Sequence, residues 1–114
     1  MKQSDIWLIN LDPTIGAEIK KTRPAIIVSD NTLGRLPLKV IVPVTDWKEK
    51  FNIAPWMVKL EPDNLNNLTK ISAVDCFQVR SISEKRFVNY IGKVDQIVLE
   101  KIQLALAKVL SIKT

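Results

Sequence analysis

Histidine is absent from this 114-residue chain, and cysteine occurs once, as Cys76. Without histidine there is no Ser-His-Asp triad, no Cys-His pair and no histidine general acid–base catalysis of the usual kind. The commonest metal ligand is missing too, and one cysteine with scattered carboxylates assembles no zinc site. We therefore expect neither metal nor cofactor, so that any catalysis must rest on Arg, Lys, Asp, Glu, Ser, Thr or Tyr.

Glycine is scarce as well, with three residues in all, so there is no glycine-rich phosphate-binding loop. No apolar run is long enough to cross a bilayer, and the first residues lead into a strand rather than a secretory signal. A single cysteine excludes an internal disulfide and fits a reducing compartment. We expect one cytoplasmic domain over residues 1–114 that makes no membrane contact.

Positive charge is in excess, because the chain has 17 lysines and arginines and 12 acidic residues, which gives a net charge of +5. A basic balance suits a polyanionic partner, although many basic proteins bind no nucleic acid. Hydrophobic residues make up 46% of the chain, which is ordinary for a globular domain with a packed core.

Short β-branched runs predict strands at 6–11, 25–28, 39–45, 55–60, 72–80 and 86–92. The segment 95–112 is the one long helix, with Asp95 as its N-cap. Its apolar stripe consists of Val98, Leu99, Ile102, Leu106, Val109 and Leu110. Several short strands and one terminal helix predict a mainly β (α+β) fold, a partly open barrel with the helix packed on it.

The predicted strand 72–80 is sorted by alternation into two faces. Asp75 shares a face with Phe77, whereas Gln78 lies on the other face. An aspartate that points with bulky apolar residues needs a hydrogen-bond partner if it is buried.

The stretch from Thr22 to Ser29 organises the chain, because a buried strand begins directly after Pro24. The proline holds the preceding Arg23 in an extended conformation, at the end of the loop 12–20. Residues on loops fixed to a rigid scaffold often carry function. From the residues alone, Arg23 is either a catalytic group or a surface cation at a strand end.

In the segment 47–51, the aromatic residues Trp47 and Phe51 flank the cations Lys48 and Lys50. Such a mixture is found where single-stranded nucleic acid stacks and is neutralised. A solvated loop with its aromatic rings tucked underneath explains the same pattern equally well.

The chain resembles the MazF/PemK/Kid family of toxin endoribonucleases in a series of short motifs that occur in the family's order. These motifs are Asp5-Ile6-Trp7, Leu11-Asp12-Pro13-Thr14, Gly16-Ala17-Glu18, Thr22-Arg23-Pro24-Ala25-Ile26-Ile27-Val28-Ser29, Val42-Pro43-Val44-Thr45, Gln78-Val79-Arg80 and Arg86-Phe87. Together with the closing apolar helix they cover nearly the whole sequence.

The resemblance implies an SH3-like barrel that forms a homodimer and cleaves single-stranded RNA without a metal, leaving a 2′,3′-cyclic phosphate and a 5′-hydroxyl. It implies that Arg23 is catalytic, that Thr45 supports it and that Glu18 takes part. A cognate antitoxin would lay an acidic C-terminal segment over the same groove. We expect RNA contacts from Lys20, Lys21, Trp47, Lys48, Lys50, Ser72 and Gln78.

Two positions depart from the family pattern. Ile19 follows the loop glutamate where many members have a polar residue, and Phe77 precedes Gln78 where some members use a carboxylate. Asp75 either substitutes for that carboxylate or is structural. Because arginine is a poor proton acceptor at neutral pH, the general base is left open between Glu18 and a bound water.

Two other functions fit the same architecture. One is a gyrase-poisoning toxin of the related CcdB group, against which the presence of both Arg23 and Thr45 argues. The other is a non-catalytic SH3-like module that binds RNA or an acidic peptide.

Overall fold

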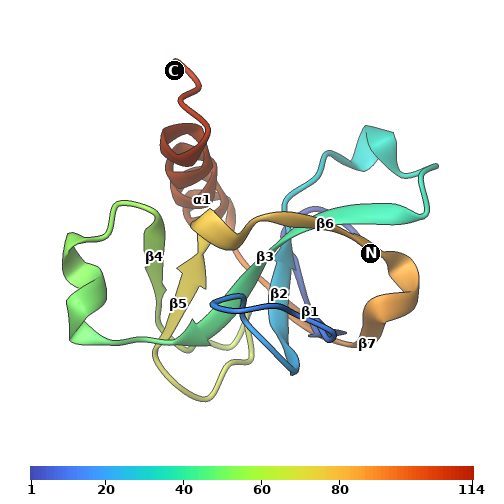
Figure 1. Cartoon of the computed structure of the whole chain (residues 1–114), viewed down its shortest axis with the longest axis horizontal. Helices are drawn as coiled ribbons and strands as arrows, with labels where there is room; N and C mark the ends of the chain where they lie inside the picture. Colours follow the sequence, from blue (N-terminus) through green and yellow to red (C-terminus); the bar gives the residue numbers. More distant parts are fainter.

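The computed structural model describes residues 1–114 (Figure 1). It shows a bent antiparallel sheet and one C-terminal helix that shares a core cluster with the sheet. The strands are β1 (Asp5–Asn10), β2 (Thr22–Ile27), β3 (Leu38–Asp46), β4 (Met57–Leu60), β5 (Ser72–Asp75), β6 (Arg80–Ser83) and β7 (Phe87–Lys93). Their order is β4-β5-β3-β2-β1-β7, with β6 paired to the first half of β3. The path does not close on itself, which confirms the predicted partly open, mainly β fold.

The long strand β3 holds the sheet together, because its first residues pair with β6, its middle residues with β2 and its last residues with β5. Alternation along the strands creates two apolar clusters on opposite sides. Ile26 and Val42 belong to the larger cluster, whereas Ala25, Ile27 and Ile41 belong to the smaller one. Both sides of the central strands are therefore buried.

The helix α1 (Gln96–Val109) begins at Asp95, whose Oδ1 accepts a hydrogen bond from the Val98 N–H at 2.8 Å, as predicted. Leu99 and Ile102 of the predicted stripe are buried in the larger cluster. Leu110 was predicted to belong to that stripe, but it follows the end of the helix and is 57% exposed. The helix is too short to cross a membrane.

The predicted continuous strand 72–80 is wrong. It is broken by η3, a turn of 3-10 helix at Cys76–Gln78, and the chain then enters β6, which was not predicted. Asp75 caps this turn by accepting the Phe77 N–H at 3.1 Å, a local bond that competes with strand pairing. Asp75 is consequently buried while Phe77 is 64% exposed, so the two side chains do not share an environment.

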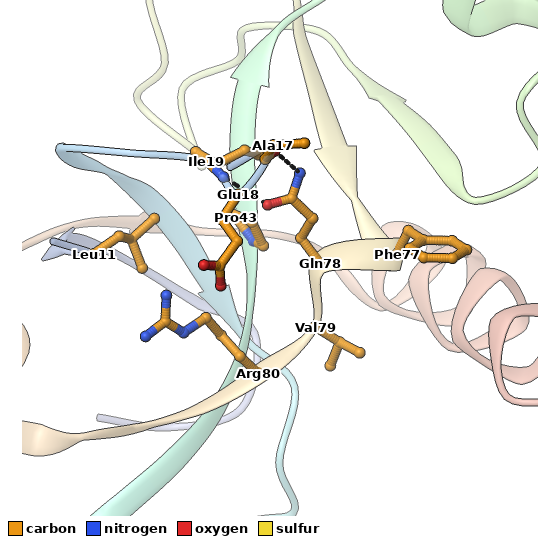
Figure 2. A pocket seen from close by; sticks show the side chains of 9 residues that line it. All are labelled: Leu11, Ala17, Glu18, Ile19, Pro43, Phe77, Gln78, Val79 and Arg80. Atoms are coloured by element: carbon orange, nitrogen blue, oxygen red, sulfur yellow. Dashed lines mark hydrogen bonds between the residues drawn. The ribbon is translucent and has the colours of Figure 1, made fainter. Parts of the chain in front are cut away.

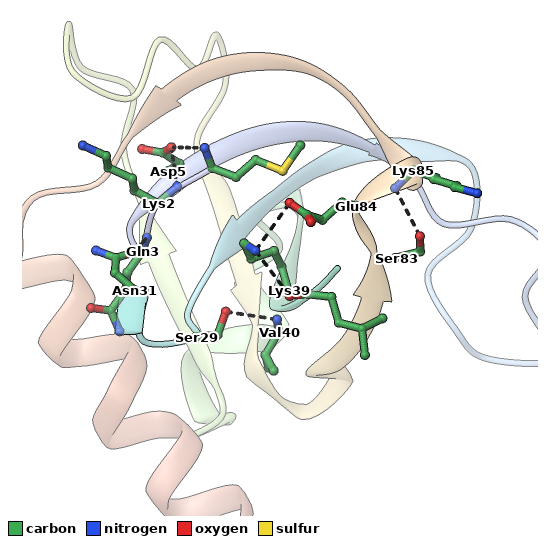
Figure 3. A network of polar contacts seen from close by, with 12 residues as sticks. Lys2, Gln3, Asp5, Ser29, Asn31, Lys39, Val40, Ser83, Glu84 and Lys85 are labelled. Atoms are coloured by element: carbon green, nitrogen blue, oxygen red, sulfur yellow. Dashed lines mark hydrogen bonds and ion pairs between the residues drawn. The ribbon is translucent and has the colours of Figure 1, made fainter. Parts of the chain in front are cut away.

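A polar network ties β6 and the turn after it to the start of β3 (Figure 3). Lys39 is buried, and its Nζ lies 3.5 Å from Oε2 of Glu84. Ser29 Oγ accepts a hydrogen bond from the Val40 N–H at 3.2 Å on the neighbouring strand. The Lys39–Glu84 ion pair thus joins the turn after β6 to the start of β3.

Gly92 on β7 provides a test of the packing between β7 and the loop that follows β4. A Cβ atom at this position would lie 2.6 Å from the Leu65 carbonyl oxygen and 2.8 Å from that of Asn66. Since backbone must move to admit it, we expect Gly92→Ala to lower the free energy of unfolding by about 1–3 kcal/mol in denaturant titrations. Gly34→Ala is the control, since its Cβ meets one carbonyl oxygen at 3.1 Å in an exposed turn. Equal stability losses in both variants would contradict this account.

Candidate active site

An open groove of about 530 Å³ lies between the loop 12–21 and the segment that joins η3 to β6 (Figure 2). Pro43 of β3 and Leu11 contribute apolar surface. The other residues that line it are Ala17, Glu18, Ile19, Phe77, Gln78, Val79 and Arg80. The predicted residues Glu18 and Gln78 therefore meet in one groove although they are far apart in the sequence.

Gln78 attaches the loop to the rest of the molecule. Its Oε1 accepts the Ile19 N–H at 2.7 Å, while its Nε2 donates to the Asp75 carboxylate at 3.2 Å and lies 3.5 Å from the Ala17 carbonyl oxygen (Figure 2). Asp75 thus has the partner that its burial requires. We name the chain of contacts Asp75–Gln78–Ile19 the loop clamp.

The two ends of the loop are also held by hydrogen bonds. Arg86 Nη1 donates to the Asp12 carbonyl oxygen at 2.6 Å, and the Lys21 N–H donates to Asp12 Oδ1 at 3.0 Å. Within the loop, Glu18 Oε1 accepts the Ile15 N–H at 2.6 Å. The loop is therefore a fixed wall of the groove, and Glu18 is held within it.

Arg23 and Thr45 lie on β2 and β3, and Pro43 of β3 lines the groove. Ala25 pairs with the groove residue Pro43, and the β2–β3 ladder ends there; Arg23 lies two residues before Ala25 and Thr45 two residues after Pro43. Residues two apart on a strand point to the same face, and that face carries Pro43, which lines the groove. Arg23 is half-buried and its Nε donates to the Lys20 carbonyl oxygen at 3.2 Å.

Arg80 is a groove residue that the sequence-based site did not include. Figure 2 shows its guanidinium and the Glu18 carboxylate extending toward one another across the groove. A signal was present, because Arg80 belongs to the motif Gln78-Val79-Arg80 that contains the predicted contact Gln78. The groove thus holds a planar cation and a carboxylate, with Arg23 beside it.

The buried pair Asp75 and Cys76 supplies no nucleophile. Burial raises the pKa of Asp75, against the hydrogen bonds from Phe77 and Gln78 that lower it. Burial, with a contribution from the Asp75 charge, raises the pKa of Cys76 to about 12. Since the thiolate is the reactive form, Cys76 is an inert core residue at neutral pH.

The other predicted RNA contacts do not line this groove. Lys20 and Lys21 are exposed at the end of the loop beside it. Trp47 packs edge-to-face against Phe51 with ring centroids 5.7 Å apart, and both residues are half-buried. This favours the alternative in which the loop is solvated and its aromatic rings pack underneath it. Lys48 and Lys50 are exposed in that same segment. Ser72 is 6% exposed and its hydroxyl donates to the Lys70 carbonyl oxygen at 2.9 Å.

No three histidine, cysteine, aspartate or glutamate side chains gather closely enough to hold a metal ion. The side chains available for chemistry are two arginines, a carboxylate, an amide and a hydroxyl. Arginine is suited to a phosphate group, because its planar fork of donors matches the phosphate oxygens. These donors match a phosphodiester better than a neutral small molecule.

Comparison with known proteins identifies the family. The sequence matches the PemK-like, MazF-like toxins of type II toxin–antitoxin systems over residues 2–110. Endoribonuclease MazF9 of Mycobacterium tuberculosis is 35% identical over 116 residues, covering 93% of this chain and 92% of that protein. Endoribonuclease PemK of Escherichia coli is 36% identical over 86 residues, covering 75% of this chain but only 62% of PemK. The chain belongs to the PemK-like, MazF-like toxin family, as its motifs indicated.

Solved structures agree on the fold. MazF from Deinococcus radiodurans superposes with a TM-score of 0.80 at 23% identity, covering 97% of this chain and 96% of that one. A mycobacterial endoribonuclease in complex with its cognate antitoxin gives a TM-score of 0.79 at 22% identity, covering 100% and 98%. These structures confirm the predicted mainly β fold with a C-terminal helix.

Proposed function

We propose that this protein is the toxin of a type II toxin–antitoxin system and cleaves single-stranded RNA without a metal ion. The observation that supports the proposal is the groove that brings Glu18, Gln78 and Arg80 together, with Arg23 and Thr45 on the adjoining strands β2 and β3. The curated relatives PemK and MazF9, which are named endoribonucleases, support it.

The proposed reaction is an internal transesterification. The ribose 2′-oxygen bonds to the adjacent phosphorus, the bond from phosphorus to the 5′-oxygen breaks, and a 2′,3′-cyclic phosphate and a 5′-hydroxyl are left. Negative charge builds on the phosphorane oxygens, where Arg23 donates its planar fork of N–H groups and Thr45 adds a hydroxyl donor. The 2′-hydroxyl proton goes to Glu18 or to a water beside it, and the departing 5′-oxygen takes up a proton from solvent.

The experiment that tests this function is to map the cleavage ends on a long RNA treated with the purified protein. We expect cuts within single-stranded regions, 2′,3′-cyclic phosphate ends and the same rate with and without a chelator. Incubation with gyrase and supercoiled DNA is run in parallel. RNA that is bound but stays intact, or DNA breaks that require gyrase, would replace this proposal by one of the two alternatives.

We propose a homodimer as the active form, with a cognate antitoxin whose acidic C-terminal segment covers the groove. The sheet ends in the unpaired edges of β4 and β7, and large apolar side chains such as Ile97 and Leu104 are exposed on α1. Association hides both kinds of surface. The cations beside the groove, Arg23, Arg80, Lys20 and Lys21, are complementary to an acidic segment as well as to RNA.

A further inference from the structure

A solvent-exposed aromatic pair extends the groove on the side of α1. Phe77 is 64% exposed and Trp56 is 36% exposed, and their ring centroids lie 5.8 Å apart at an interplanar angle of 68°. Phe77 itself lines the groove, and Figure 2 shows its ring projecting to the side opposite Glu18 and Arg80. Because Phe77 is so exposed and meets Trp56 edge-to-face, part of the Phe77 ring surface is left uncovered.

The backbone under both rings is fixed. The Phe77 N–H donates to Asp75 Oδ1 at 3.1 Å, and the Cys76 N–H donates to the Trp56 carbonyl oxygen at 3.1 Å. The buried Cys76 between them belongs to the main core. A large apolar ring that is held outward on a rigid turn presents a preformed surface, which lowers the entropic cost of binding a flat ligand.

We propose that Phe77, backed by Trp56, is a stacking platform for one unpaired base of the RNA. This inference rests on the proposed function and deepens it. The groove that joins Phe77 to Arg80 is continuous, so that an extended strand with a phosphate near the arginines can place a neighbouring base on the ring. Aromatic rings bind bases through their faces, and cations neutralise the backbone in the same channel.

Other exposed aromatic residues on the chain lack this setting. Tyr90 on β7 is 50% exposed and packs edge-to-face on Trp7 with centroids 5.9 Å apart, yet it lines no part of the groove. The two pairs therefore have nearly the same geometry and differ in their surroundings. Tyr90 provides the matched control for Phe77.

The test uses a short RNA that contains a mapped cleavage site and is fully 2′-O-methylated, so that it binds without being cut. A single abasic nucleotide is placed at each position in turn, and affinity is measured for the wild type and for Phe77→Ala. We expect one abasic position to weaken wild-type binding by roughly 5- to 150-fold. The same position should have no further effect on Phe77→Ala, whose affinity for the intact RNA is already reduced to that level. Phe77→Trp should keep most of the affinity.

Tyr90→Ala should retain the wild-type response at every position. Equal abasic losses in the wild type and in Phe77→Ala would overturn the platform while leaving the nuclease function in place. A change of mass in light scattering for Phe77→Ala, with RNA affinity unchanged, would assign the pair to an interface between copies and overturn it too. Loss of binding to an acidic peptide with RNA affinity intact would assign it to a protein partner, against the proposal. A wild type that neither binds nor cuts RNA would overturn both this inference and the proposed function.

Discussion

Arg23→Ala should lower the rate of RNA cleavage by on the order of 100- to 1000-fold, which corresponds to about 3–4 kcal/mol of transition-state stabilisation. The reason is that Arg23 lies on β2, two residues before the Ala25 that pairs with the groove residue Pro43, and carries the planar donors that the proposed mechanism directs at the phosphate. Its backbone is held extended by Pro24 and by pairing with Ile9, so that the guanidinium needs little reorganisation when charge develops on the phosphate. The measurement is single-turnover cleavage of an RNA with a mapped site.

The variant should remain folded, because Arg23 makes one side-chain hydrogen bond, to Lys20, and is only half-buried. Circular dichroism and thermal melting check this.

Arg23→Lys should recover little activity, since an ammonium does not reproduce the planar fork of donors. Thr45→Ala should lower the rate less than Arg23→Ala. Arg35→Ala, in an exposed turn away from the groove, serves as the control. Cleavage by Arg23→Ala at near the wild-type rate would show that the mechanism is wrong even though the family assignment stands.

Most of the fold could be predicted because its main strands and its helix have clear sequence patterns. β2 and β3 contain β-branched apolar runs, and α1 has a cap and a periodic stripe. The prediction failed at 76–78, where the Asp75 side chain accepts a hydrogen bond from the Phe77 N–H and caps a turn that interrupts the strand. A hydrogen bond of this kind depends on local geometry that alternation does not encode.

The candidate site was predicted in part for a similar reason. Arg23, Thr45 and Glu18 follow from short motifs, and of these the groove contains Glu18, together with the predicted residue Gln78. The exposure of Phe77 could not be predicted, because as a strand residue it was expected to lie with Asp75. Ser72 belongs to the predicted RNA contacts, yet pairing with Asp46 and Leu60 buries it in the sheet. Pairing partners far along the chain determine such burial.

Gln78→Leu is the second variant with a large expected effect, on the order of 10- to 100-fold in cleavage rate, because small displacements of a wall that positions substrate are costly. Apart from the bond from Arg23 to the Lys20 carbonyl oxygen, all hydrogen bonds from residues 13–20 to the rest of the chain run to Gln78. Leucine keeps the bulk of the side chain and removes these bonds. Amide hydrogen exchange at Ile19 should accelerate in the variant, whereas a Gln78 that contacts only RNA would leave this exchange unchanged.

Asp75→Asn tests the other end of the loop clamp. The Gln78 amide donates to the Asp75 carboxylate and accepts from the Ile19 N–H, so its orientation is set by an acceptor on one side and a donor on the other. An asparagine that keeps its own oxygen on the Phe77 N–H would turn an NH₂ group toward the Gln78 NH₂ group. One end of the clamp must then break, and we expect slower cleavage and faster exchange at Ile19, in the same direction as Gln78→Leu.

The pH dependence of stability separates the charge of Asp75 from its role in the clamp. Burial raises the pKa of this carboxyl above 3.8, so that the folded protein binds the proton more readily than the unfolded chain does. The resulting stabilisation is fully present below 3.8 and is lost as the pH rises through the folded-state pKa. Asparagine does not titrate, so the free energy of unfolding of the wild type minus that of Asp75→Asn should fall with rising pH across this window and then stay level. Denaturant titrations of both proteins measure this difference. A difference that does not vary with pH would show that the pKa of Asp75 is not raised by folding.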